Sequence, residues 1–244
     1  TWARILPDGT GKVNEKGIEF YDNVINELLK YNIKPYITLF HWEYPYALHK
    51  KGGWLNDDSP AWFAEYARVV VERFSDRVTD YFTLNEPQCF IGLGYNSGEF
   101  APGEHHTYKD QFIMVHNVLK AHGLAVRQMR EAAKRDIKIG FAPTGQISYP
   151  ASDSKEDIEA AREHLFDLSD DMGNWTWNLS WWMDPVLLGH YPEKGLRIYE
   201  KYLPKITDED MKMINEPLDF LGQNIYNGHM IRCGADGKPE VVQR

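Results

Sequence analysis

Three short segments of the sequence group an ionisable side chain with amides and aromatic rings. They are His41-Trp42-Glu43, Asn85-Glu86-Pro87 and Asn224-Ile225-Tyr226. A carboxylic acid in such surroundings suits sugar chemistry, because aromatic faces pack on the C–H faces of a pyranose while Asn, His and Tyr hydrogen-bond its hydroxyls. In a poorly hydrated pocket, the Glu86 carboxyl would stay protonated near neutral pH and could protonate a glycosidic oxygen as its bond breaks.

Each of the three segments lies at the end of a run of residues that predicts a buried strand. These runs cover residues 35–40, 81–84 and 220–225, and a further strand is predicted at 137–141. Apolar stripes at helical spacing separate them; we expect helices from Asn14, from Ser59-Pro60, around 112–129 and from the capping box Ser154–Asp157. Strands joined by helical crossovers are parallel, and in such sheets functional residues gather at the carboxyl ends.

The number of strands is small for the fold. Counting Ala3-Arg4-Ile5-Leu6 as a strand gives about five, whereas a closed (β/α)8 barrel needs eight. No linker, short repeat or low-complexity segment divides the chain, so we expect one domain over residues 1–244.

Composition excludes several classes of function. The 27 basic and 36 acidic residues give a net charge of −9, which disfavours nucleic acid as a partner. No apolar run approaches the roughly 18 residues that cross a bilayer, so no membrane contact is expected. Two cysteines, Cys89 and Cys233, form neither a disulfide framework nor a zinc site. We therefore expect a cytoplasmic protein with no metal and no cofactor.

The motifs resemble those of glycoside hydrolase family 1, the β-glucosidase and phospho-β-glycosidase family. Thr83-Leu84-Asn85-Glu86-Pro87 is similar to the family's Thr-Phe-Asn-Glu-Pro segment, and the resemblance covers the whole chain in family order. Further matching segments are Trp2-Ala3-Arg4-Ile5, which resembles the end of the second barrel strand, His41-Trp42-Glu43, Gly52-Gly53-Trp54, Ala101-Pro102-Gly103, His116-Asn117, Asp184-Pro185, His190-Tyr191-Pro192 and Asp219-Phe220-Leu221-Gly222.

The resemblance implies a retaining hydrolase of β-glucosides or oligosaccharides in which Glu86 is the general acid and then the general base. It also implies that five residues bind or orient the sugar: Asn85 at the 2-hydroxyl, His41 at another glycone hydroxyl, Trp42 as a wall of that subsite, and Asn224 and Tyr226 as lining residues, the tyrosine orienting the nucleophile. Glu43 stands where the family has Asp, and Gln88 where many members have a Trp that walls the aglycone site.

Two segments of the family pattern do not occur between Thr1 and Arg244: the first strand and the Thr-Glu-Asn-Gly segment that carries the nucleophile. We therefore expect a partial (β/α)8 barrel, about strands two to six, with unpaired edge strands that invite association. Flanking sequence, a complementary chain or self-association would complete it. By itself the 244-residue chain should lack normal retaining activity.

Other readings of the same residues remain open. A carbohydrate-binding module without catalysis, or a structural fragment of a barrel, would use His41, Trp42, Asn85 and Tyr226 equally well. A metal enzyme built on His105-His106 is disfavoured, because adjacent histidines on a loop rarely converge on one ion. Cys89 lies close to Glu86, but no motif supplies it with a base, so we expect a packed thiol rather than a nucleophile.

Overall fold

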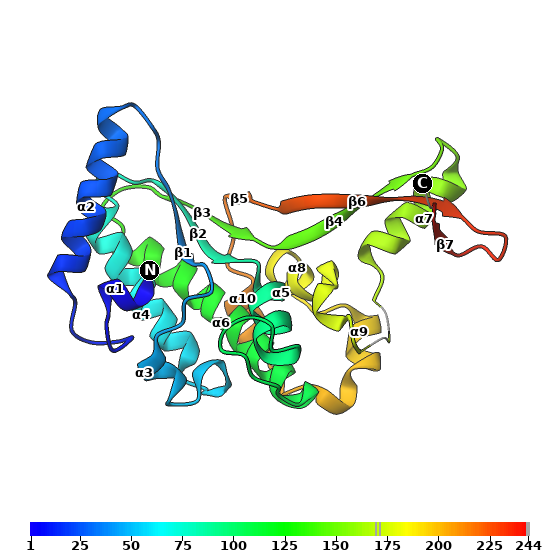
Figure 1. The fold of residues 1–244 in the computed structure, drawn as a ribbon, viewed down its shortest axis with the longest axis horizontal. Coiled ribbons are helices and arrows are strands. Elements are labelled where there is room, and N and C mark those ends of the chain that lie inside the picture. Colours follow the sequence, from blue (N-terminus) through cyan, green and yellow to red (C-terminus); the bar gives the residue numbers. More distant parts are fainter. Residues whose placement is uncertain (169, 171, 243–244) are drawn as a thin grey trace.

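The computed structural model describes residues 1–168, 170 and 172–242. Its main sheet contains four parallel strands in the order β1 (Tyr36–Phe40), β2 (Asp80–Asn85), β3 (Lys138–Ala142) and β5 (Phe220–Leu221) (Figure 1). Strands that follow one another in the chain are neighbours in the sheet, as in the wall of a (β/α)8 barrel. The sheet is open, because β1 and β5 each pair on one side only. The expectation of a partial barrel is therefore confirmed.

Long amphipathic helices cover this sheet. They are α2 (Glu15–Lys30), α4 (Ser59–Phe74) and α6 (Tyr108–Ala132), and α4 packs along α6. Asn14 is the N-cap of α2 as expected, although its side chain donates to the Arg4 carbonyl instead of capping the helix. Ser59 is the first residue of α4 and Asp58 is its cap, one residue from the expected position. The helical stripes were thus located correctly, with small shifts at their ends.

The strand expected at residues 3–6 is wrong. Trp2–Ile5 forms the short helix α1, in which the Leu6 N–H donates to the Trp2 carbonyl at 2.9 Å. Trp2 is fully buried and stacks on Tyr66, with ring centroids 5.3 Å apart. Trp2 and Ile5 lie three residues apart and both are buried, which is helical spacing, but one turn is too short to show a period.

A second sheet extends from the first and was not expected from the sequence. It contains β4 (Thr144–Pro150), β6 (Asn224–Cys233) and β7 (Pro239–Val241), with β4 parallel to β6 and β7 antiparallel to it. The single strand expected at 220–225 is therefore divided between β5 and the start of β6. Figure 1 shows β4 and β6 running away from the main sheet as a ribbon, with α7 (Lys155–Phe166) against it.

Shorter elements complete the described part of the chain. They are α3 (Tyr46–His49), η1 (Gly53–Leu55), α5 (Pro87–Ile91), the π-helical turn η2 (Gly92–Asn96), η3 (Trp175–Trp177), α8 (Leu179–Leu187), α9 (Glu193–Ile198), η4 (Glu200–Tyr202) and α10 (Asp208–Ile214). Within the residues described, no helix combines the length and the apolar character that crossing a membrane requires.

Candidate active site

Glu86 lies at the carboxyl end of β2, where the backbone turns sharply into α5. Its amide donates to the Ala142 carbonyl at 2.7 Å, which continues the pairing of β2 with β3 by one residue. Its backbone is left-handed, with φ +46°, and Pro87 then begins the helix. A non-glycine residue in this region costs about 1–3 kcal/mol and persists only where surrounding contacts hold it. The turn places the Glu86 side chain, which is only 5% exposed, at the end of the sheet.

Three donors surround the Glu86 carboxylate. Asn224 Nδ2 donates to Oε1 at 2.5 Å, and the Tyr226 hydroxyl lies 3.5 Å from the same oxygen. On the other side, the Cys89 thiol donates to Oε2 at 3.2 Å. Each of the two carboxyl oxygens thus has at least one polar side-chain neighbour.

An amide relay connects Glu86 to the loop after β1. Asn224 Nδ2 also donates to Asn85 Oδ1 at 3.0 Å, and Asn85 Nδ2 lies 3.3 Å from His41 Nε2. Because an amide nitrogen can only donate, His41 Nε2 must accept, which leaves the proton of the neutral ring on Nδ1. The structure therefore brings together His41, Asn85, Glu86 and Asn224, which come from three separate strand ends.

Trp42 also adopts a left-handed backbone, with φ +83°. Its indole N–H donates to the Asn85 carbonyl at 2.8 Å, so it is not available to a sugar hydroxyl. Its ring lies 5.5 Å from that of Phe100, between centroids, and remains partly exposed. The indole nitrogen of Trp42 thus holds the end of β2, and the aromatic face of the ring remains partly accessible to a ligand. Tyr226, the other aromatic residue predicted to line the site, is far more exposed than Trp42, at 82%.

Gln88 contacts the second sheet in a way that the sequence did not reveal. It stands where many members of the family have a Trp that walls the aglycone site, and its own side chain is fully buried. Gln88 Nε2 donates to the Thr144 carbonyl at 2.8 Å, and the Thr144 N–H donates back to Gln88 Oε1 at 3.3 Å. Thr144 pairs with Asn224 in the ribbon, so this double contact fixes the strand that carries Asn224. The only signal in the sequence was an amide where the family has an aromatic residue.

A buried histidine supports β2 from α6. His122 Nδ1 lies 2.7 Å from Thr83 Oγ1, two residues before Asn85, and the ring is fully buried. Its Nε2 has no hydrogen-bond partner among the described residues. Burial lowers the pKa of His122 to about 3, which keeps the ring neutral.

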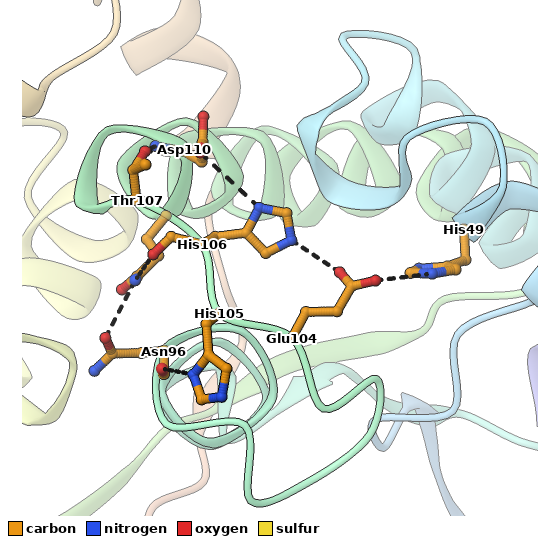
Figure 2. A network of polar contacts seen from close by, with 8 residues as sticks. His49, Asn96, Glu104, His105, His106, Thr107 and Asp110 are labelled. Atoms are coloured by element: carbon orange, nitrogen blue, oxygen red, sulfur yellow. Dashed lines mark hydrogen bonds and ion pairs between the residues drawn. The ribbon is translucent and has the colours of Figure 1, made fainter.

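The adjacent histidines of the loop before α6 do not converge. In Figure 2, His106 faces Glu104, with Nε2 and Oε2 2.8 Å apart, while His105 Nδ1 faces the Asn96 carbonyl at 3.0 Å. Glu104 also reaches His49 Nε2 at 3.3 Å and so bridges two elements. The described residues contain no group of three or more His, Cys, Asp or Glu side chains arranged to hold a metal ion.

Two cavities adjoin residues of the site. One of about 750 Å³ lies between the ribbon and η3, and its lining includes Tyr226, Trp177 and Asn178. The other, of about 370 Å³, is lined by Trp42, Tyr95 and Pro102, among others. Each offers an aromatic surface next to a candidate sugar-binding residue, as carbohydrate sites do.

Comparison with known proteins adds independent evidence. Residues 1–241 match the profile of glycosyl hydrolase family 1. The chain is 44% identical over 242 residues to a 1,4-beta-D-glucan glucohydrolase of Thermotoga neapolitana and 42% identical to beta-glucosidase A of Thermotoga maritima, covering 99% of this chain and 54% and 52% of those proteins.

The structure agrees with these matches. The solved beta-glucosidase from Thermotoga maritima in complex with glucoimidazole superposes with a TM-score of 0.81 at 41% identity, over 100% of this chain and 53% of that one. The chain therefore spans about half the length of the relatives it matches. With the profile matched over nearly its whole length, the chain belongs to glycosyl hydrolase family 1.

Proposed function

We propose that this chain supplies the acid/base half of a retaining β-glucosidase site, with Glu86 as the proton donor and acceptor. The observation that carries the proposal is the buried Glu86 carboxylate, held at the end of a parallel sheet by Asn224, Tyr226 and Cys89. Names of the relatives, which include a glucan glucohydrolase and beta-glucosidases, support a terminal β-glucoside as substrate.

The reaction has two steps. In the first, Glu86 gives its proton to the glycosidic oxygen as the C1–O bond breaks, and a second carboxylate bonds to C1. In the second, the Glu86 carboxylate takes a proton from water, whose oxygen attacks C1 and releases the second carboxylate with retention. Because Glu86 is only 5% exposed, its carboxyl would be largely shielded from bulk solvent in both steps.

The neighbouring residues would bind the sugar ring. Asn85 would donate its second amide hydrogen to the 2-hydroxyl, a contact that strengthens as the oxocarbenium character grows. His41 would donate from Nδ1, since its Nε2 accepts from Asn85. Trp42 would pack its exposed face on the ring, because its nitrogen is already bonded. Asn224 and Tyr226 would act through Glu86, which both contact.

The second carboxylate must lie about 5–5.5 Å from Glu86 in a retaining enzyme. The Thr-Glu-Asn-Gly segment that carries this carboxylate in the family pattern does not occur in residues 1–244. We assign the nucleophile to sequence outside residues 1–244 or to another chain, and we expect the 244 residues alone to show no normal retaining turnover.

Both cysteines are free thiols, in keeping with a cytoplasmic location.

The test is a pair of substitutions in a complete barrel that contains these residues. Glu86→Ala should lower kcat/KM for an alkyl β-glucoside by roughly 10²–10⁴-fold, and much less for a dinitrophenyl glucoside, whose leaving group needs no proton. Glu99→Ala is the matched control, since Glu99 is an exposed glutamate on the following loop. Equal losses for both leaving groups, or none, would refute the role of Glu86.

A non-catalytic sugar-binding role is the competing function. Glu86→Gln separates the two, because the amide preserves the size of the side chain but cannot give up a proton. Binding of a β-glucoside should survive this change while turnover disappears. Turnover that persists at the parent rate would refute the catalytic role of Glu86, whereas binding without turnover in the parent itself would favour the non-catalytic role.

A further inference from the structure

We propose that Cys89 is a positioning residue whose thiol donates to Glu86 Oε2 and favours the deprotonated form of that carboxyl. The inference rests on the proposed function of Glu86 and deepens it. The two residues lie one helical turn apart, with Sγ 3.2 Å from Oε2. The Cys89 amide also donates to the Glu86 carbonyl at 2.9 Å, so the turn that begins α5 fixes the thiol on the carboxylate.

The two oxygens of Glu86 have different partners. Oε1 accepts from the Asn224 amide and faces the Tyr226 hydroxyl, whereas Oε2 accepts from the thiol. A thiol is a weaker donor than an amide or a hydroxyl. The proton of the acid form therefore resides on Oε2, since protonating Oε1 would displace the stronger donors. Cys89 thus contacts the oxygen that must gain and lose a proton in each catalytic cycle.

The thiol keeps its own proton under working conditions. Burial raises the pKa of Cys89 well above its ordinary value, and the hydrogen bond to Glu86 adds to this shift. Cys89 is 7% exposed, which limits access of solvent to the contact. A thiol of this kind is a stable donor and a poor nucleophile, and it differs from a merely packed thiol through its bond to the carboxylate.

The titratable groups that face this pair come from separate elements. Cys89 approaches the carboxylate from α5 and Tyr226 from β6, while His41 reaches it indirectly, through Asn85, from the loop after β1. Substitution at Cys89 leaves the last two contacts in place. A change in the proton affinity of Glu86 can therefore be attributed to the thiol.

The first experiment compares pH profiles of kcat/KM in the complete barrel. Cys89→Ala removes the donor, so the alkaline limb should move to higher pH by roughly 0.4–1 unit, the equivalent of one hydrogen bond. Cys89→Ser keeps a donor of similar size, so its limb should lie at or below the pH of the parent's limb. Coincident profiles for Cys89→Ala and the parent, or equal shifts for Ala and Ser, would overturn the inference.

A second measurement reports the contact without activity. Cys233→Ser leaves Cys89 as the single thiol, because the sequence has two cysteines. The infrared S–H stretch should then move to higher frequency in Glu86→Gln, since an amide oxygen accepts more weakly than a carboxylate. An S–H band that Glu86→Gln leaves unchanged would show that no such bond exists.

The outcomes separate the two proposals. If Glu86→Gln keeps activity and the alkaline limb, the proposed function fails. If Glu86→Gln abolishes the limb while Cys89→Ala leaves it at the parent pH, only the inference about Cys89 fails.

Discussion

Replacing His122 by asparagine should make the stability of the protein less sensitive to mild acid. His122 is fully buried beneath β2, and its Nε2 has no partner in the described part of the chain. Burial lowers its pKa to about 3, against an ordinary value of 6.5. Between these two values the unfolded chain binds a proton at this residue and the folded protein does not. The neutral ring of His122 therefore costs the folded protein no stability above pH 6.5, and the free energy of unfolding decreases as the pH falls from 6.5 toward 3.

The size of the effect follows from the two pKa values. Going from pH 7.5 to pH 5 crosses most of the titration of the unfolded histidine, which costs the folded state about 2 kcal/mol. The side chain introduced by His122→Asn cannot take up this proton, while its amide can still reach Thr83 Oγ1, which lies 2.7 Å from His122 Nδ1. Between pH 7.5 and pH 5, the free energy of unfolding should thus fall by about 2 kcal/mol less in His122→Asn than in the parent.

Urea denaturation at a series of pH values measures this difference. The absolute stability of His122→Asn is expected to be lower at every pH because the smaller side chain leaves a void, so the comparison uses the slope alone. His105→Gln is the matched control, since His105 is exposed and should leave the slope of the parent unchanged. Parallel curves for His122→Asn and the parent would refute the argument that this imidazole is held neutral.

Two other substitutions test the supports of the site. In the complete barrel, Trp42→Phe removes the donor to the Asn85 carbonyl and should lower kcat/KM by roughly 3–10-fold in steady-state kinetics. Trp62→Phe is the control, since Trp62 is a half-buried tryptophan of α4; an equal loss in this variant would contradict the specific role of Trp42. Gln88→Leu leaves the Thr144 N–H and carbonyl without their partner and should lower the free energy of unfolding in urea by about 1–3 kcal/mol. Gln88→Glu should have an intermediate effect because it retains the acceptor for the Thr144 N–H. Unchanged stability in Gln88→Leu would disprove the double contact.

The two central strands of the main sheet were predictable because both of their faces are buried. β2 and β3 are buried along nearly their whole length, as expected for parallel strands covered by helices. The ribbon strand β4 was missed for the opposite reason: its residues are exposed or half-buried, and its sequence, Thr144-Gly145-Gln146-Ile147-Ser148, resembles a loop. Long-range pairing with β6, not local preference, makes it a strand.

The site was predictable to the extent that strand ends determine it. His41, Asn85, Glu86 and Asn224 were selected because each follows a predicted parallel strand, and they form one connected set of hydrogen bonds. The contact of Cys89 depends on the turn at Glu86, and that of Gln88 on a strand that the sequence did not reveal. Such contacts are set by tertiary geometry, which residue type and spacing do not encode.

The left-handed backbones of Trp42 and Glu86 have a consequence for how this sequence can change. Glycine would adopt either conformation at no steric cost, but it would remove the indole that donates to Asn85 and the carboxylate that accepts from Asn224 and Cys89. The proposed function uses both side chains. Under the proposed function, selection for turnover would therefore retain a strained backbone at both positions, where local strain alone would favour glycine.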